Sequence, residues 1–445
     1  MDFILVGGLT AMDLELGKLS RKRYLKYLLF SIIGVAMATS AFLYQKKEVN
    51  PPELRTQSIN MEEKYPRLAN LFFKWDITDI EAKELAKWDL VAIDMEAGIK
   101  TPENLKKIRE YNPNIKILAY ITAQEFTYRE DLLKESVLRR KIYKDFSEDW
   151  WLKTKNGGRL IWWPGTWMIN VTNDAGVNKK GQRWNEYLPE FIASNVLSTG
   201  YWDGVFYDNT WDGVVWLPSG KELDFNEDGV ADGAEEIDKK WQEGMEKIFQ
   251  KTRELAPDKI VMSNGGKTYA NLLNGITIEH FHRMDWSWGM NDYFTVLKED
   301  QDPETMILAC NTDNTGISDD YKKMRYCFAS ALLGDGYFAF DYGDQAHNYL
   351  WWYDEYDVFL GRPNGSAYNI LDPKNQDLNR GVWRRDFERG IVLVNSTDKK
   401  QTIFLEDEFH KINGNQDKEA NSGEIVKKIS LEANDGIILL KISVD

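Results

Sequence analysis

Cysteine, histidine and net positive charge are all scarce in this sequence. Only two cysteines and four histidines occur in 445 residues. Cys310 and Cys327 are too few for a disulfide framework and lack metal-ligand neighbours in sequence, so we interpret both as small buried hydrophobic residues. Because 71 acidic residues outnumber 56 lysines and arginines, we expect no nucleic-acid partner, since phosphate binding requires a basic surface.

Signatures of two widespread enzyme classes are missing as well. No GxSxG motif presents a nucleophilic serine, and no glycine-rich phosphate fingerprint follows the first predicted strand. An HxH pair, His280 and His282, leaves a metal-dependent hydrolase open as an alternative. Only His347 and His410 remain to complete such a site, and neither lies at a predicted strand end, so the sequence argues against a catalytic metal.

An uncharged stretch at residues 27–44 follows a cluster of lysines and arginines near the N-terminus. It is long enough to span a bilayer, and its positive flank belongs on the cytoplasmic side. Small residues at Ala36, Ala38 and Ala41 also resemble a signal-peptidase site, so retention as a membrane anchor and cleavage both stay open. In either case we predict that the catalytic part of the chain lies outside the cytoplasm.

Short apolar runs alternate regularly with helical patterns through the middle of the chain. Eight such runs read as strands, and they lie at residues 71–75, 90–93, 115–121, 205–207, 259–263, 276–279, 306–310 and 337–340. A βα alternation repeated eight times favours a closed parallel TIM (β/α)8 barrel over an open doubly wound sheet. The long excursion between the third and fourth runs contains an NGG turn at 156–158, which predicts a hairpin insertion on the active face.

The helical period disappears beyond about residue 361. Paired β signals replace it, which predicts a small antiparallel β-sandwich after the barrel. The expected segments are a cytoplasmic leader (1–26), a transmembrane anchor or signal peptide (27–45), a polar linker (46–65), a (β/α)8 barrel (66–360) and a C-terminal β domain (361–445).

Acidic side chains follow several predicted strands, at the position where barrel enzymes keep their chemistry. Glycoside hydrolysis needs two carboxyl groups, one protonated and one ionised. We predict that Asp208 is the ionised partner, acting as nucleophile or base, and that Glu279 is the general acid, with the reverse assignment open. We expect the substrate to be bound by four strand-end polar residues and by flat indole rings that can stack on sugars. These residues are Asp94, Glu96, Asn264, Asp341, Trp211 and Trp286.

The segment DFNEDGVADGAE at residues 224–235 has the ligand spacing of an EF-hand loop, with Gly229 at the sixth position. The predicted ligands to a structural Ca2+ are Asp224, Asn226, Asp228, the Val230 carbonyl, Asp232 and Glu235. No regular helix precedes the loop because of Pro218, so an opening sensor is not expected. A solvated acidic turn is the alternative.

With these residues identified, the chain resembles a family of TIM-barrel proteins, glycosyl hydrolase-like family fifteen, and is more distantly similar to endo-α-1,4-polygalactosaminidase barrels. The resemblance covers about residues 66–445 and is carried by WDGVFYDN, DFNEDGVADGAEE, IVMSNGG, RDFERGIVLVNSTDK and NDGIILLKI. It implies an Asp after the fourth strand and a Glu after a later one, which Asp208 and Glu279 match. An α-amylase-like scheme would place an acid where Asn264 stands.

The sequence therefore predicts a membrane-anchored or secreted glycoside hydrolase that acts on a polysaccharide or oligosaccharide. Its abundance of tryptophan, at 17 residues, agrees with sugar binding, although packing in the core explains most of them. A non-catalytic polysaccharide-binding protein on the same barrel is the alternative.

Overall fold

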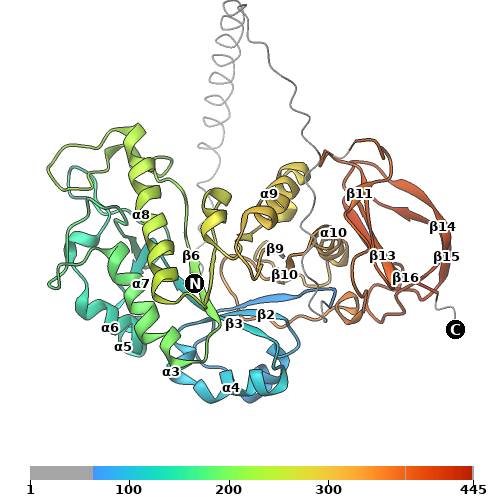
Figure 1. Cartoon of the computed structure of the whole chain (residues 1–445), viewed down its shortest axis with the longest axis horizontal. Helices are drawn as coiled ribbons and strands as arrows, with labels where there is room; N and C mark the ends of the chain where they lie inside the picture. Colours follow the sequence, from blue (N-terminus) through green and yellow to red (C-terminus); the bar gives the residue numbers. More distant parts are fainter. Residues whose placement is uncertain (1–63, 376, 443–445) are drawn as a thin grey trace, which may run out of the picture. The chain divides into compact units, whose positions relative to one another are not determined.

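The computed structural model describes residues 64–375 and 377–442 (Figure 1). No helix in these ranges is long and apolar enough to cross a membrane. The predicted span at 27–44, and the leader and most of the linker on either side of it, lie outside the described residues.

All eight predicted strands are present, with ends shifted by at most a few residues. They are β1 (Ala69–Phe72), β2 (Leu90–Asp94), β3 (Lys116–Thr122), β6 (Gly204–Asp208), β7 (Ile260–Ser263), β8 (Thr277–Ile278), β9 (Ile307–Asn311) and β10 (Tyr337–Asp341). Every pairing among them is parallel. Continuous ladders join β1-β2-β3-β6-β7 and β8-β9-β10 into two arcs.

Single parallel bridges join the two arcs at both seams. Ser263 pairs with Ile276 between β7 and β8, and Leu68 pairs with Phe338 between β10 and β1. The eight strands therefore follow one another in a circular order, although the hydrogen-bonded ladder is not continuous around the ring. Because all eight are parallel, their carboxyl ends lie at one rim, where the chemistry of barrel folds is found.

Side chains alternate between the two faces of these strands and form two separate cores. Helices pack on the outer face and enclose the larger core. The inner face holds a smaller cluster built from Leu71, Ala92, Leu118, Phe206 and their neighbours on the other strands. The helices are α2 (Asp79–Leu85), α3 (Ala97–Lys100), α4 (Pro102–Tyr111), α5 (Glu130–Glu135), α6 (Val137–Asp145), α7 (Trp184–Asn195), α8 (Ala234–Leu255), α9 (Trp286–Glu299) and α10 (Tyr321–Leu332).

The excursion between β3 and β6 carries α5, α6 and a two-stranded sheet, β4 (Glu125–Thr127) with β5 (Thr166–Met168). The predicted turn within it is confirmed, because Lys153 pairs with Arg159 and Gly157 has a φ of +78°, which favours glycine. Since β4 follows β3 by only a few residues, the insertion lies against the carboxyl rim of the strands.

The C-terminal part is antiparallel, as predicted, but it is one six-stranded sheet and not two separate ones. Its strands are β11 (Tyr368–Asn369), β12 (Val382–Asp386), β13 (Gly390–Asn395), β14 (Gln401–Lys411), β15 (Ile425–Leu431) and β16 (Asp435–Lys441), in the order β11-β12-β13-β16-β14-β15. A register shift between Phe404 and Phe409 lets β14 pair with both β15 and β16. Helix α10 packs against β13 and β16 (Figure 1).

The interpretation of the two cysteines as unpaired residues was wrong. Cys310, on β9, and Cys327, on α10, form a disulfide over a sequence separation of 17 residues. Both residues are fully buried, as expected, but the packing of α10 against β9 also brings their side chains together. Two cysteines this far apart in sequence carry no pairing signal, so only the tertiary contact could show it.

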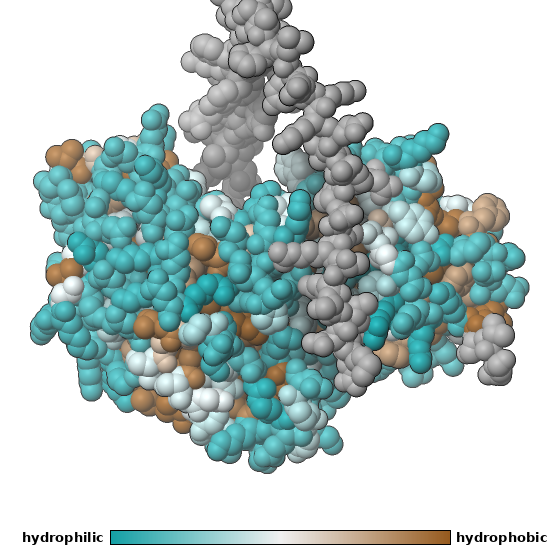
Figure 2. All heavy atoms as spheres, in the orientation of Figure 1, coloured by the Kyte–Doolittle hydropathy of each residue, from teal (hydrophilic) through white to brown (hydrophobic). Residues whose placement is uncertain are grey.

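The surface seen in Figure 2 is largely hydrophilic, and hydrophobic side chains lie on it in small, separate groups. This agrees with the excess of acidic residues in the sequence.

Candidate active site

Side-chain alternation decides which residue at each strand end faces the interior of the ring. Phe206 belongs to the inner cluster, and Asp208, two residues later, lies on the same face. Asn264 and Asp341 follow Met262 and Ala339 in the same way. Glu279 follows Ile278, which packs in the outer core, so its side chain takes the inner face. The sequence order thus directs several polar side chains to one rim.

Asp208 is held in place by three donors. The Tyr120 hydroxyl donates to one carboxylate oxygen at 2.7 Å. The Asn264 amide donates to the other oxygen at 2.9 Å, and the backbone N–H of Asn209 donates to it at 2.8 Å. Burial and the charge of Asp208 raise the pKa of Tyr120 well above its usual range, so Tyr120 remains a neutral donor. Asp208 itself stays partly exposed at the rim.

Asn264 lies close to both predicted acids, because its amide donates to Asp208 and its side chain also lowers the pKa of Glu279. Burial raises the pKa of Glu279, and the nearby charge of Asp208 raises it further. His347, Asn264 and His280 oppose this shift without cancelling it. The two carboxyl groups therefore interact electrostatically, and the surroundings favour the protonated form of Glu279. Asn264, which was predicted to bind substrate, therefore holds Asp208 beside Glu279.

His347 belongs to the same cluster, although it does not lie at a predicted strand end. Its Nδ1 atom forms a short hydrogen bond with Asp341, at the end of β10. Burial opposes the charged form of the ring, but Asp341, Glu279 and Asp208 together raise the pKa of His347. The missed signal is position, since His347 lies only six residues beyond a strand-end acid.

Glu125 is a third acid near Asp208 that the sequence analysis missed. It lies on β4 and is 4% exposed. Its carboxyl accepts hydrogen bonds from the Thr166 hydroxyl at 2.7 Å and from the Asn209 side chain at 3.0 Å. Burial raises the pKa of Glu125 to about 7, and the charge of Asp208 contributes to the shift. Its place in the sequence, three residues beyond the end of β3, could have identified Glu125 as a candidate site residue.

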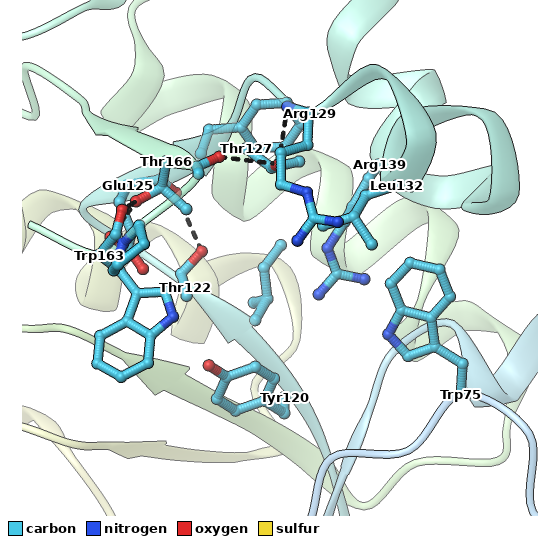
Figure 3. Close-up of a pocket in the computed structure, with 14 residues that line it drawn as sticks. Trp75, Tyr120, Thr122, Glu125, Thr127, Arg129, Leu132, Arg139, Trp163 and Thr166 are labelled. Atoms are coloured by element: carbon cyan, nitrogen blue, oxygen red, sulfur yellow. Dashed lines mark hydrogen bonds between the residues drawn. The ribbon is translucent and has the colours of Figure 1, made fainter. Parts of the chain in front are cut away.

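A cavity of about 250 Å³ opens beside Glu125 (Figure 3). Tyr120, the donor to Asp208, lies at its base, and the indole rings of Trp75 and Trp163 lie on opposite sides. The remaining lining comes from β3, the β4 and β5 segments and the nearby helices: Ile121, Thr122, Phe126, Thr127, Arg129, Leu132, Arg139, Pro164, Gly165 and Thr166. Aromatic walls with a few polar groups suit a sugar ring.

Two of the predicted substrate-binding acids have structural roles instead. Glu96 is fully buried, and its carboxylate accepts hydrogen bonds from Ser136 and from the first backbone N–H groups of α6. It therefore caps that helix, where a negative charge is favourable, and the prediction for Glu96 is wrong. Asp94 is 3% exposed and forms a bidentate pair with Arg139, at 2.9 and 2.7 Å. Asp94 thus positions an arginine that lines the cavity.

The two predicted sugar-stacking tryptophans differ. Trp286 is 1% exposed, donates its indole N–H to Ser330 and packs on Trp383 of the C-terminal sheet. It cannot stack on a sugar, so that prediction is wrong. Trp211 is partly exposed, three residues beyond Asp208, and packs edge-to-face with Trp162.

The predicted calcium loop is folded around Asp224. The carboxylate of Asp224 accepts hydrogen bonds from the backbone N–H groups of Asp228 at 3.2 Å and Gly229 at 2.7 Å, and Gly229 has a φ of +86°. Asp232 is engaged by Lys240 at 2.6 Å and by the Phe225 amide at 2.7 Å.

The donor atoms of this loop suit calcium, but they are not gathered around one point. Among the described residues, its carboxylates do not converge to within 4.8 Å of one another. Binding an ion would therefore require the loop to tighten, and calcium stays a prediction.

The HxH pair does come close to a carboxylate. Ligand atoms of His280, His282 and Asp313 lie within 4.8 Å of one another. However, Asp313 also accepts from Arg283 at 2.6 Å and pairs with Lys323 at 3.0 Å. Two cations on the same carboxylate disfavour a divalent ion there. The sulfur atoms of Cys310 and Cys327 lie beside His282, but their disulfide removes them as ligands.

Several solved structures align with the chain at low identity. A GH36 α-galactosidase, AgaA, from Geobacillus stearothermophilus aligns with 13% identity and a TM-score of 0.45, over 85% of this chain and 56% of that chain. The chain therefore spans about half the length of this relative. A maltogenic α-amylase, AmyB, from Thermotoga neapolitana aligns with 11% identity and a TM-score of 0.47, over 85% and 99%. The trehalulose synthase MutB from Pseudomonas mesoacidophila aligns with 10% identity and a TM-score of 0.47, over 84% of this chain and 98% of that chain.

The family assignment comes from the sequence. No curated protein matches the chain. Residues 109–391, well over half of the chain, match the family described as hypothetical glycosyl hydrolase family 15. This range runs from α4 into β13, so it includes Glu125, Asp208, Asn264, Glu279 and His347. The chain belongs to hypothetical glycosyl hydrolase family 15.

Proposed function

We propose that this protein hydrolyses glycosidic bonds with Glu279 as proton donor and Asp208 as the ionised carboxylate. One observation carries the proposal: Asp208, held by the Asn264 amide, and Glu279 lie at strand ends on one rim, and burial together with the charge of Asp208 favours protonation of Glu279. Two acids kept in different protonation states are what glycoside hydrolysis requires. Family membership supports the same reaction class.

The first step breaks the bond between the anomeric carbon and the leaving-group oxygen. Glu279 donates its proton to that oxygen as the bond lengthens, and Asp208 stabilises the positive charge that develops on the sugar ring. A water molecule then bonds to the anomeric carbon through its oxygen. It keeps one proton as the new sugar hydroxyl and gives the other to a carboxylate that acts as base. Tyr120, Asn264 and Asn209 keep Asp208 oriented, so little reorganisation is needed in the transition state.

His347 tunes the pair in this scheme. Its ring is kept close to the two acids by Asp341, and its positive charge lowers the pKa of Glu279 against the larger effects that raise it. The charge of His347 therefore makes Glu279 a stronger acid than burial alone would, which favours donation of its proton.

An extracytoplasmic polysaccharide or oligosaccharide is the proposed substrate. The Cys310–Cys327 disulfide supports this location, because disulfides persist mainly in oxidising compartments. The uncharged stretch at 27–44 would hold the protein at the membrane or direct its secretion.

A structural calcium ion is part of the same proposal. Asp224, Asn226, Asp228, the Val230 carbonyl, Asp232 and Glu235 offer oxygen ligands, and the loop already turns around Asp224. Hydrogen bonds tie this loop to the β3–β6 insertion, because the Asp224 N–H donates to the Lys153 carbonyl and the Asn170 amide donates to the Phe225 carbonyl. The ion would therefore stabilise the insertion and take no part in the chemistry.

Reducing-sugar release from bacterial exopolysaccharides and cell-wall glycans tests the function. We expect Glu279→Gln and Asp208→Asn each to lose roughly 10² to 10⁴ of kcat/KM on any glycan that the wild type cleaves. Glu110→Gln, an exposed change on α4, is the matched control and should keep full activity. Unchanged rates in both site variants would remove the assignment to this pair. Binding without cleavage by the wild type would instead identify a polysaccharide-binding protein.

A further inference from the structure

Three tryptophan rings cluster on two loops near the candidate active site, and the catalytic scheme does not use them. Trp162 and Trp216 are 42% and 57% exposed, and Trp211 lies between them, partly exposed. The ring centroids are 4.5 Å apart for Trp162–Trp211, 5.3 Å for Trp211–Trp216 and 5.5 Å for Trp162–Trp216. We call Trp162, Trp211 and Trp216 the tryptophan platform.

The rings of the platform meet edge to face, with interplanar angles of 77°, 72° and 83°. In this arrangement the rings pack edge to face against one another, while about half of the surface of Trp162 and Trp216 stays exposed, at 42% and 57%. Exposing this much aromatic surface is unfavourable in water and marks a surface that binds something. The open face of an indole ring matches the C–H face of a pyranose sugar.

The platform is held in position before any ligand arrives. The Trp216 indole N–H donates to the Gly213 carbonyl at 2.8 Å, which fixes the orientation of that ring. The Trp211 carbonyl accepts hydrogen bonds from the side chains of Gln124 at 2.8 Å and Trp241 at 3.1 Å. A preorganised surface loses little conformational entropy when a ligand binds.

The platform is continuous in the chain with the cavity. Trp163, which follows Trp162, forms one wall of that cavity. Gln124, which anchors Trp211, precedes Glu125 in the same cavity. Trp211 lies three residues beyond Asp208. The residues of the platform and its anchors are thus direct chain neighbours of residues that line the cavity, where Tyr120 contacts Asp208.

We propose that the tryptophan platform binds the sugar units of a polysaccharide that extend beyond the cavity, so that the natural substrate is a polymer and not a short glycoside. The proposal rests on the proposed function for the nature of the ligand. A cavity of about 250 Å³ holds only a short part of a glycan, and the aromatic surface next to it is the place where the rest can stack. The observation in favour of a glycan over a protein partner is this continuity with the cavity.

Binding by an inactive variant separates this proposal from the catalytic one. Asp208→Asn is applied to an array of immobilised bacterial exopolysaccharides and cell-wall glycans, and Kd is measured for each polymer that binds. We expect Trp162→Ala and Trp216→Ala, each in the Asp208→Asn background, to weaken that binding roughly tenfold or more. Trp162→Phe and Trp216→Phe keep an aromatic face and should retain most of the affinity.

Trp288→Ala is the matched control, because Trp288 is 75% exposed on α9 and lies outside the platform. Its Kd should equal that of the parent. Equal binding by the two platform variants and the control would overturn the proposal, as would the absence of binding to every polysaccharide. In the wild-type background the platform variants should raise KM for the polymer and leave kcat/KM for aryl glycosides unchanged. If the wild type cleaves aryl glycosides but the platform variants have an unchanged KM for polymers, the role of the platform is refuted. The proposed hydrolysis would still stand.

Discussion

At the scale of single residues, Glu125 shows how burial next to another acid changes a carboxyl group. Its pKa rises to about 7 in the folded protein from an ordinary value of 4.5. Between these two pH values the folded state keeps a proton that the unfolded state releases, so the free energy of unfolding falls as pH rises.

Glu125→Gln removes this titration. The difference in free energy of unfolding between the variant and the wild type should therefore change between pH 4 and pH 8. We expect it to shift by about 3 kcal/mol in favour of the variant. Urea unfolding of both proteins at several pH values measures the change. A difference that stays constant with pH would show that Glu125 ionises normally in the folded protein.

His347 acts on catalysis through charge. His347→Asn keeps a side-chain N–H for Asp341 but removes the positive charge that lowers the pKa of Glu279. Deprotonation of the general acid should then occur at higher pH, so we expect the alkaline limb of the kcat/KM profile to move to higher pH. The profile is recorded on a glycan that the wild type cleaves. An alkaline limb that does not move would exclude the tuning role.

At the scale of elements, the disulfide joins a barrel strand to the helix that carries the C-terminal sheet. Cys310 lies on β9 and Cys327 on α10, which packs against β13 and β16. Closing a loop of this length restricts the unfolded chain and stabilises the folded state by about 3 kcal/mol. We expect Cys310→Ser with Cys327→Ser to lose about that amount in urea unfolding.

Wild type treated with a thiol reductant is the control for the double variant, because both lack the covalent link. The two should unfold at similar urea concentrations. A double variant as stable as the oxidised wild type would show that the cross-link contributes nothing.

The calcium loop makes a prediction at the same scale. Removing calcium with a chelator should lower the midpoint of thermal unfolding, because an ion that binds only the folded state stabilises it. Asp224→Asn should abolish the response, whereas Glu254→Gln, at the other end of α8, should keep it. An unchanged midpoint in the wild type would leave the loop as an acidic turn.

At the scale of the whole molecule, the disulfide and the N-terminal segment support the same location. Protein recovered from the membrane or medium of an expressing cell should contain no free thiol when denatured without reductant, because both cysteines are paired. Thiol titration checks this, and N-terminal sequencing of the same sample distinguishes a retained anchor from cleavage near Ala41. Two free thiols, or recovery only from the cytoplasm, would contradict the proposed location.

Local patterns in the sequence determined the number, order and kind of the eight parallel strands. Eight apolar runs between helical segments were enough to predict eight parallel strands, because buried strands and amphipathic helices have different periods. They also placed Asp208, Glu279 and Asp341 at strand ends, and period-two alternation then directs these side chains to one face.

Contacts between distant segments were decided only by the tertiary structure. The Cys310–Cys327 pairing, the capping of α6 by Glu96, the burial of Trp286 and the arrival of His347 and Glu125 beside the two acids all depend on which elements pack together. Packing is set by the whole arrangement of elements, whereas the sequence pattern is local. For this reason the sequence by itself determined which strand-end residues reach the rim, and only the fold decided which residues from other segments meet them there.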